Sequence, residues 1–330
     1  MDAKSMNKLW KQYGLKEESL SPLVRRFCFQ QENCDGEMYL LEPYEGVQVR
    51  VSEFQSKSME FPFQEDGNLL GFNYCMEGRY EIQMPESKYV YIEKGTLSVD
   101  TTPFIGLTSF PGGKYMGLEM IIDLDKIVEK PIMSWEEYEI NPTKMAQLSK
   151  NIKGTFLVNA GYEWEQLAQE FMGHIKNADL SAGNYRFLLL RLLWSFQNEQ
   201  EQKEFTVYKP IFLTAGQRNI AIRTEKKLTE DLGKHYIIAD LAKQEGISAT
   251  SLKKYFALHF GNPISFYLKE ERIKRAEELL RETSMSIADI ASHVGYENQG
   301  KFSTMFRQEK GSTPIEYRRL HRKEHIFYEQ

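Results

Sequence analysis

Apolar residues in the last third of the chain recur with helical spacing in two copies of one pattern. The nine residues IADLAKQEG at 238–246 return 49 positions later as IADIASHVG at 287–295. In the first copy Ile238, Leu241 and Ala242 stand at i, i+3 and i+4, the spacing of one buried helix face. Each copy therefore predicts a short helix that ends in a tight turn at its glycine, where no side chain restricts the backbone.

Both copies continue with a second predicted helix. Ser248 and Asn298 are favourable N-caps, and each is followed by apolar residues at helical spacing that pack inward. The outer face of this helix carries small, amide and lysine side chains, which suit the major groove of DNA. The candidate DNA-contacting residues are Ser248, Thr250, Lys253, Lys254, Asn298, Gln299, Lys301 and Thr304.

The segment between the two copies predicts one longer helix. Pro263 is favourable at a helix start, and the apolar pattern continues to about Glu282. The expected inward stripe consists of Phe266, Ile273, Ala276 and Leu280. At 1.5 Å per residue this helix spans roughly 27 Å. We therefore expect the two recognition helices to lie about one DNA turn, roughly 34 Å, apart and to contact successive major-groove segments.

The stretch from Ser286, SIADIASHVGYENQGKFSTMFRQEKGSTPIEYRR, resembles the AraC/XylS family of bacterial transcription regulators in the order and spacing of its I-A, G-Y, F-S, F, G, P and Y-R-R positions. The resemblance covers about 226–319 and implies a pair of helix-turn-helix motifs that bind promoter DNA. A generic helical bundle would also show apolar stripes and helix caps. It would need neither two copies of the pattern nor the Gly-x-x-Pro-x-x-Tyr-Arg-Arg sequence that ends the second copy. There are departures from the family pattern, because Ile237 replaces a capping residue and neither outer face carries an arginine. We therefore expect lysine contacts and amide readout from Gln299.

Charge is divided unevenly along the chain. The net charge is −5, yet residues 211–330 hold 20 Lys and Arg against 16 Asp and Glu, so this part is basic and the first 210 residues are acidic. An excess of four positive charges is modest, so phosphate contacts should come from individually placed groups. Besides the lysines above, Arg272 and Arg307 are candidates.

Residues from about 37 to 123 form short β-branched and aromatic segments separated by turn signals, which predicts a β-sandwich or barrel. The family resemblance implies a cupin-like barrel that binds a small effector, so 1–134 are expected to be an N-terminal arm and such a barrel. Apolar walls with a few polar tips are typical of ligand pockets, and arginines receive anionic groups. The candidate effector contacts are Arg50, Tyr74, Arg79 and Tyr80.

Residues 135–212 predict two amphipathic helices and a linker. The family resemblance implies that these helices pair two subunits, and we favour this over the alternative that they only cover the barrel. Residues 213–330 complete the chain as the DNA-binding domain. The expected fold is thus α+β and multidomain: a cupin-like barrel, a central helical pair and an all-α domain with two helix-turn-helix motifs.

The first 173 residues contain no histidine, so the barrel lacks the ligands with which catalytic cupins hold a metal. We predict no catalytic residue, no metal and no cofactor. Three cysteines form no paired framework, and we identify neither a membrane span nor a signal peptide, which favours the cytoplasm. The expected partners are promoter DNA, a small-molecule effector, a second subunit and RNA polymerase. The alternatives are a cupin-like β-barrel enzyme with a helical appendage and a constitutive DNA-binding protein.

Overall fold

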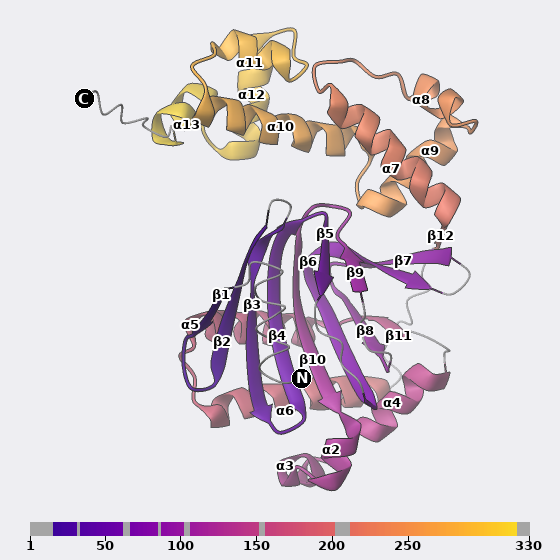
Figure 1. The fold of residues 1–330 in the computed structure, drawn as a ribbon, viewed down its shortest axis with the longest axis vertical. Coiled ribbons are helices and arrows are strands. Elements are labelled where there is room, and N and C mark those ends of the chain that lie inside the picture. Colours follow the sequence, from indigo (N-terminus) through magenta and orange to yellow (C-terminus); the bar gives the residue numbers. More distant parts are fainter. Residues whose placement is uncertain are drawn as a thin grey trace. The chain divides into compact units, whose positions relative to one another are not determined.

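The computed structural model describes residues 16–31, 34–61, 67–84, 87–101, 106–151, 156–201 and 212–321. The chain divides into two compact units, residues 1–212 and 213–330, which we describe separately (Figure 1). The predicted N-terminal arm and the predicted linker, except for Phe212 at its end, lie outside the described residues.

The N-terminal unit is built on a large antiparallel sheet. Its main path runs β1 (Lys16–Ser19), β2 (Val24–Gln31), β3 (Cys34–Tyr44), β4 (Val47–Ser56), β10 (Tyr115–Asp123), β6 (Leu69–Met84) and β7 (Lys88–Glu93). Strand β6 is long enough to pair further with β8 (Thr96–Asp100) and β9 (Gly106–Ser109), which pair in turn with β11 (Phe156–Asn159) and β5 (Ser58–Phe61). The strand-rich region predicted from the β-branched and aromatic segments is confirmed.

Closure of this sheet into a barrel is not confirmed. Among the described residues β1 pairs only with β2, so the strand path has an open end there. The register of β6 shifts opposite Met116 and Gly117, where two residues of β6 occupy the place of one. Such a bulge reverses which face the following side chains occupy. Sequence alternation cannot show this shift, because the bulge depends on the partner strand.

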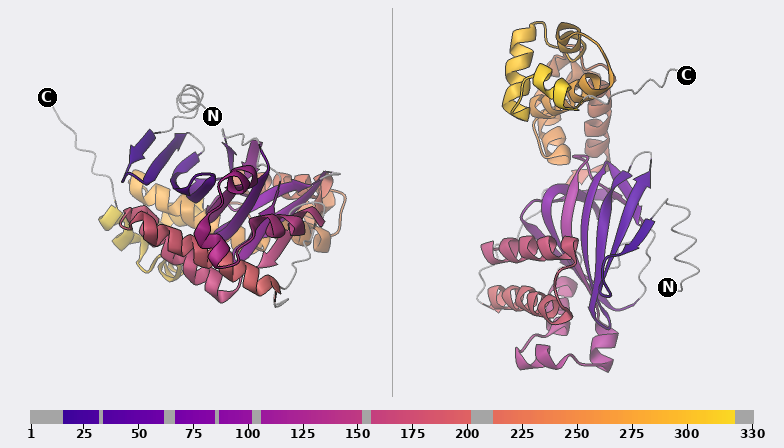
Figure 2. Two further views of the ribbon diagram at one scale, coloured as in Figure 1. Left: turned by 90° about the horizontal axis from the view of Figure 1, so that it is seen from below. Right: turned by 90° about the vertical axis from the view of Figure 1, so that its left-hand side faces the viewer.

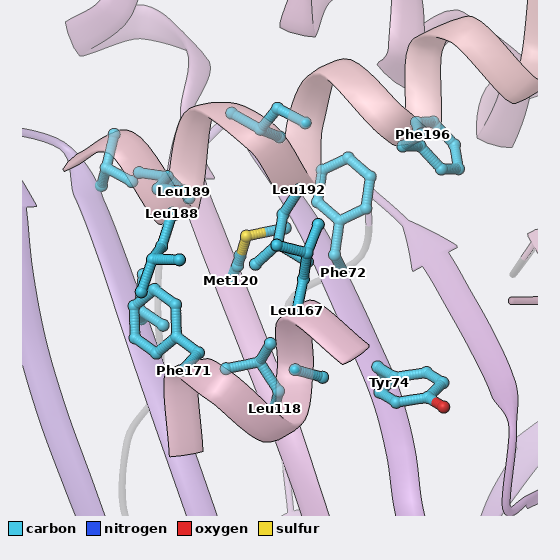
Figure 3. Close-up of a cluster of buried hydrophobic side chains, with 14 of the residues drawn as sticks. Phe72, Tyr74, Leu118, Met120, Leu167, Phe171, Leu188, Leu189, Leu192 and Phe196 are labelled. Carbon is cyan, nitrogen blue, oxygen red and sulfur yellow. The ribbon is translucent and has the colours of Figure 1, made fainter. Parts of the chain in front are cut away.

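Two helices cover one face of the sheet (Figure 2). Helices α5 (Tyr162–Asn177) and α6 (Ala182–Glu201) follow β11 in the chain, and both pack their apolar faces on β-strand side chains (Figure 3). Phe196 of α6, for example, meets Phe72 of β6 edge to face with ring centroids 5.1 Å apart. The predicted helices are confirmed, but their apolar faces cover the sheet and are therefore not available to pair subunits. The buried apolar residues of these two helices are Trp164, Leu167, Ala168, Phe171, Ile175, Tyr185, Leu188, Leu189, Leu190, Leu192, Leu193 and Phe196.

Shorter helices close the end of this layer. Helix α2 (Leu124–Glu129) follows β10 directly and is capped by Asp123, whose carboxylate accepts a hydrogen bond from the Lys126 amide. It is followed by α3 (Met133–Glu137) and α4 (Pro142–Asn151), which bring Trp135 and Met145 into the same core. Burial of these side chains makes the helices part of the N-terminal unit.

The C-terminal unit is helical. It contains β12 (Leu213–Thr214), α7 (Ala215–Glu230), α8 (Ile238–Gln244), α9 (Ala249–Phe260), α10 (Ile264–Glu282), α11 (Ile287–His293), α12 (Gln299–Lys310) and α13 (Pro314–His321). Its apolar residues form two separate cores, one around Phe256 and one around Phe302. Helix α10 contributes to both, because Ile264 and Tyr267 enter the first core and residues from Ile273 onward enter the second.

Most local signals of this unit are confirmed. Ser248 accepts from the Ser251 amide at 3.1 Å, and Asn298 accepts from the Lys301 amide at 3.0 Å. Ile237 stands at the N-cap position of α8 and provides no side-chain cap. One expectation is wrong: Phe266 is 43% exposed, and its neighbour Tyr267 is buried instead. The first turn of α10 faces the first core, so its buried stripe is offset from that of the later turns.

None of the described helices is both long and apolar enough to traverse a lipid bilayer. Over the same residues there is no group of three or more His, Cys, Asp or Glu side chains placed to hold a metal ion. Cys75 is buried between strands, which raises the pKa of its thiol to about 12, and Cys28 is partly buried.

Candidate DNA-binding site

The first module consists of α8, the turn at Gly246 and α9. Gly246 has a φ of +69°, so the turn uses the left-handed conformation that glycine adopts without strain. The carboxylate of Glu245, at the end of α8, accepts from Arg223 at 2.6 Å and from Lys227 at 3.2 Å on α7. The hydrogen bond from Arg223, and to a smaller extent the one from Lys227, lowers the pKa of the Glu245 carboxyl. The module is thereby held on α7.

Helix α9 presents a polar face to solvent. Leu252 and Phe256 are fully buried, whereas the candidate residues Thr250, Lys253 and Lys254 are exposed. The hydroxyl of Ser248 caps the helix, so its side chain has a local role. The amide groups of the first turn remain directed outward along the helix axis, where they favour an anion such as phosphate. The structure thus brings the candidates of the first module together on one surface.

The second module, α11, the turn at Gly295 and α12, repeats this arrangement. Phe302 and Phe306 are fully buried, and Gln299, Lys301 and Thr304 are exposed on the opposite side of α12. The Thr304 hydroxyl donates to the Gly300 carbonyl at 2.9 Å, which leaves its methyl group and lone pairs for an outside partner. Asn298, like Ser248, serves as the cap.

The ending Gly-x-x-Pro-x-x-Tyr-Arg-Arg has a structural explanation. Gly311 ends α12 with a φ of +72°, and Pro314 is the buried first residue of α13. The Tyr317 ring lies 5.4 Å from Phe306, and Arg318 donates to the Met285 carbonyl at 2.6 Å. Helix α13 therefore packs against the second core and leaves the polar face of α12 exposed.

One basic candidate already has internal partners. The sequence suggests Arg272 as a phosphate contact, and in the structure its guanidinium donates to the carbonyls of Leu232 at 3.0 Å and Lys234 at 3.1 Å. It is partly buried between the modules, whereas the candidate lysines Lys253, Lys254 and Lys301 are exposed. A planar guanidinium that donates to two carbonyls of one loop holds that loop in place.

Comparison with known proteins agrees with this geometry. Residues 241–320 match a family model described as a helix-turn-helix domain. The C-terminal unit thus contains a helix-turn-helix domain of the AraC type. A protein of Yersinia pseudotuberculosis serotype O:1b named HTH-type transcriptional activator RhaR is 37% identical over 91 residues, which are 28% of this chain and 31% of that protein. A protein of the same name from Mannheimia succiniciproducens is 34% identical over 91 residues, 28% of this chain and 33% of its own length.

Among solved structures, the C-terminal domain of AraT, a response regulator from Geobacillus stearothermophilus, is similar with 26% identity and a TM-score of 0.32, covering 34% of this chain and 93% of that domain. The match to the curated relatives spans about a third of their length. The relationship therefore concerns the AraC/XylS-type domain, and the activity of the whole protein is a separate question.

The structure does not bring the four candidate effector residues together. Tyr74 faces the core under α5, with its ring 6.1 Å from Trp164, whereas Tyr80 lies in the second sheet cluster beyond the bulge. Arg79 is bound to Glu93, and its guanidinium lies 5.3 Å from the Tyr91 ring. Of the four, Arg50 and Tyr80 lie on the sheet face opposite the α5 and α6 helices.

That face carries a row of polar side chains that the sequence did not reveal. By strand register Arg50 is opposite Glu119, Glu119 is opposite Asn73, and Asn73 is opposite Ser98, so the four lie side by side across β4, β10, β6 and β8. We call these residues the polar row. The Asn73 amide donates to Glu119 at 3.0 Å. Burial raises the pKa of the Glu119 carboxyl, and the Arg50 charge opposes this shift.

Aromatic hydroxyls border the polar row. The Tyr115 hydroxyl donates to Asn73 at 2.7 Å, and the hydroxyls of Tyr80 and Ser98 are 2.8 Å apart. Burial raises the pKa of both tyrosines well above the usual value, so both remain neutral donors at physiological pH. The sequence could not identify this cluster, because its members come from four strands whose pairing only the fold determines.

Proposed function

We propose that this protein is an effector-responsive transcription regulator, and that its two modules contact two successive major-groove segments of promoter DNA. The observation that carries the proposal is the pair of exposed polar faces on α9 and α12, which are joined by the single helix α10. With 19 residues, α10 spans roughly 28 Å, which suits recognition helices about one DNA turn apart. A regulator that activates transcription would also contact RNA polymerase, and promoter DNA would place the protein in the cytoplasm.

Selection of duplexes from a random pool with the full chain tests DNA binding. On the selected duplex, Lys301→Ala should weaken binding and reduce the slope of log affinity against log salt by about one, because one phosphate contact is lost. Lys274→Ala on α10 removes the same charge outside the recognition faces and should leave the slope unchanged. Equal slopes for wild type and Lys301→Ala would remove Lys301 from the contact surface. Failure to select any duplex at low salt would overturn the proposal.

We further propose that the sheet is cupin-like and that its polar row binds the effector. A row that mixes a guanidinium, a carboxyl, an amide and a hydroxyl beside tyrosine rings suits a small polar molecule with both donor and acceptor groups. Such a molecule alters DNA binding only if it prefers one arrangement of the protein over another, and the two affinities are then linked reciprocally. No described feature favours the enzyme alternative.

Thermal shift with sugars, siderophores and aromatic acids tests this site. A compound present at about 100 times its Kd should stabilise the N-terminal unit by about 2.7 kcal/mol. Arg50→Gln should abolish the shift, whereas Arg25→Gln, on β2 next to the edge strand β1 and paired with Glu17, should retain it. A stabilising compound whose effect survives Arg50→Gln would move the effector site away from the polar row.

We propose that the outer face of α6 pairs two subunits. The inner face is occupied by the sheet, but Phe187 is 56% and Trp194 is 44% exposed, about one turn before and one turn after Arg191. Arg191 lies 5.9 Å from the Phe187 ring and is paired with Glu170 on α5. An exposed aromatic stripe with a polar rim is typical of a protein interface.

Analytical ultracentrifugation of the full chain tests the α6 interface. Trp194→Ala should raise the dimer dissociation constant by about 30-fold, because truncating a central aromatic anchor costs about 2 kcal/mol. Tyr138→Ala removes an aromatic side chain that is also 53% exposed, and it should leave the constant unchanged. A wild-type chain that stays monomeric at high concentration would contradict pairing altogether.

A further inference from the structure

The two modules are structurally distinct, so something must fix the angle between them. The core around Phe256 and the core around Phe302 share no buried residue, and α10 runs from one into the other. A single helix fixes the distance between the modules, but side-chain contacts beside it must fix their rotation. Arg272 lies on α10 between Tyr267 of the first core and Ile273 of the second, which is the boundary between the modules.

Arg272 connects this boundary to the first module. Its Nε donates to the Leu232 carbonyl at 3.0 Å and its Nη2 donates to the Lys234 carbonyl at 3.1 Å, both in the loop that joins α7 to α8. Burial lowers the pKa of the guanidinium, but an arginine remains charged at any physiological pH. Two charge-assisted bonds from one planar fork fix both the position and the direction of the loop.

The same guanidinium contacts the second module. It lies 5.8 Å from the ring of Tyr296 and directly under Gly295, where an added Cβ would come within 2.5 Å of the Arg272 Nη2 and 2.6 Å of the Leu232 carbonyl oxygen. The neighbouring Gly233 of the loop approaches the end of α11 in the same way, since a Cβ there would be 3.3 Å from the His293 carbonyl. Loop, guanidinium and turn therefore form three layers in contact.

The contact also borders a groove beside the first recognition helix. This groove of about 840 Å³ is lined by Lys253 and Lys254 of α9, Lys269 and Arg272 of α10, Tyr236 of the α7–α8 loop and Tyr296 of the second module. Lys269 is bound to Glu309 of α12, which adds a second tie from α10 to the second module. A change in the Arg272 contact would thus move α9 relative to α12.

We propose that Arg272, held between the α7–α8 loop and Gly295, sets the rotation between the two modules. This rotation in turn sets the number of base pairs accepted between two half-sites, which are the two major-groove segments that the modules contact. This inference rests on the proposed DNA binding by both modules. Inserting one base pair moves the second half-site by about 3.4 Å along the duplex and turns it by roughly 34°. A rigid pair of modules discriminates against that change, and a pair free to rotate tolerates it.

The test compares spacing tolerance in the full chain. Fluorescence anisotropy is measured with the selected duplex and with versions that have one base pair inserted or removed between the half-sites. The wild type should bind the altered duplexes about tenfold or more weakly. Arg272→Lys keeps the charge but loses the fork, and Gly295→Ala forces the guanidinium and the loop apart. In both variants the ratio should fall to about threefold or less.

Two substitutions serve as matched controls. Arg275→Lys alters an arginine of the same helix that is paired only locally, with Glu278 at 2.8 Å. Gly246→Ala places a side chain at the equivalent turn of the first module, where φ is +69° but nothing lies within 4 Å of the added Cβ. Both should keep the wild-type ratio, although Gly246→Ala also strains its turn.

The outcomes are distinct. A wild-type ratio in Arg272→Lys and Gly295→Ala would overturn the inference while leaving DNA binding intact. Equal loss of affinity for every duplex, with the ratio unchanged, would show a general structural effect and would overturn it too. A wild-type chain that selects no duplex would overturn the proposed function, and the inference with it. Should one variant fail to fold by circular dichroism, the other decides.

Discussion

Replacing Phe302 with alanine should lower the free energy of unfolding of the C-terminal unit by about 3–5 kcal/mol and abolish DNA binding by the second module. Phe302 is fully buried at the centre of the second core, with its ring 5.7 Å from both Tyr296 and Phe306. The cavity left by its ring cannot be refilled, because the residues around it are held by α10, α11 and α13.

The sequence provides a convenient probe for this experiment. All four tryptophans, at positions 10, 135, 164 and 194, lie in the N-terminal unit. Urea unfolding followed by tryptophan fluorescence should therefore be the same for wild type and Phe302→Ala, whereas circular dichroism should show an earlier loss of helix in the variant. Phe266→Ala, which removes a 43% exposed ring from the same unit, should change the free energy of unfolding by less than about 1 kcal/mol. Similar losses in both variants would contradict the core assignment.

The C-terminal unit was predictable because its signals are local. An N-cap such as Asn298, a left-handed glycine such as Gly295 and an apolar stripe at helical spacing each act within a few residues. The repetition of all three at nearly constant offset removes most alternatives. Phe266 shows the limit: an apolar residue at the start of α10 satisfies the pattern, yet Tyr267 is the one that reaches the first core.

The N-terminal unit was predictable in element type but not in pairing. Tyr74 and Tyr80 were both expected to contact one effector, but the bulge in β6 puts them in different cores. The polar row depends on the register of four strands, so neither Glu119 nor Asn73 carries a local signal. Likewise, the apolar faces of α5 and α6 could either pair two subunits or cover the sheet, and only the position of the sheet distinguishes these two explanations.

Replacing Phe171, in the core between the helices and the sheet, should destabilise the N-terminal unit and leave the C-terminal unit unchanged. This is the opposite of the result expected for Phe302. Phe171 is fully buried between α5 and the sheet (Figure 3). Its ring lies 5.7 Å from the ring of Tyr185 on α6. We expect Phe171→Ala to lower the free energy of unfolding of the N-terminal unit by about 3–5 kcal/mol. Because the two units have separate cores, the transition followed by tryptophan fluorescence should move to lower urea, and the helix-rich transition of the C-terminal unit should not.

Tyr162→Ala is the matched control, because this ring on the same helix is 78% exposed and should leave both transitions in place. Under conditions that unfold only the N-terminal unit of Phe171→Ala, one C-terminal unit should still bind the selected duplex, while effector response and pairing of subunits should both be lost. That combination follows if DNA contact belongs to α9 and α12 and regulation belongs to the sheet with α5 and α6. Loss of DNA binding in step with the tryptophan transition would instead show that the C-terminal modules depend on the N-terminal unit for their fold.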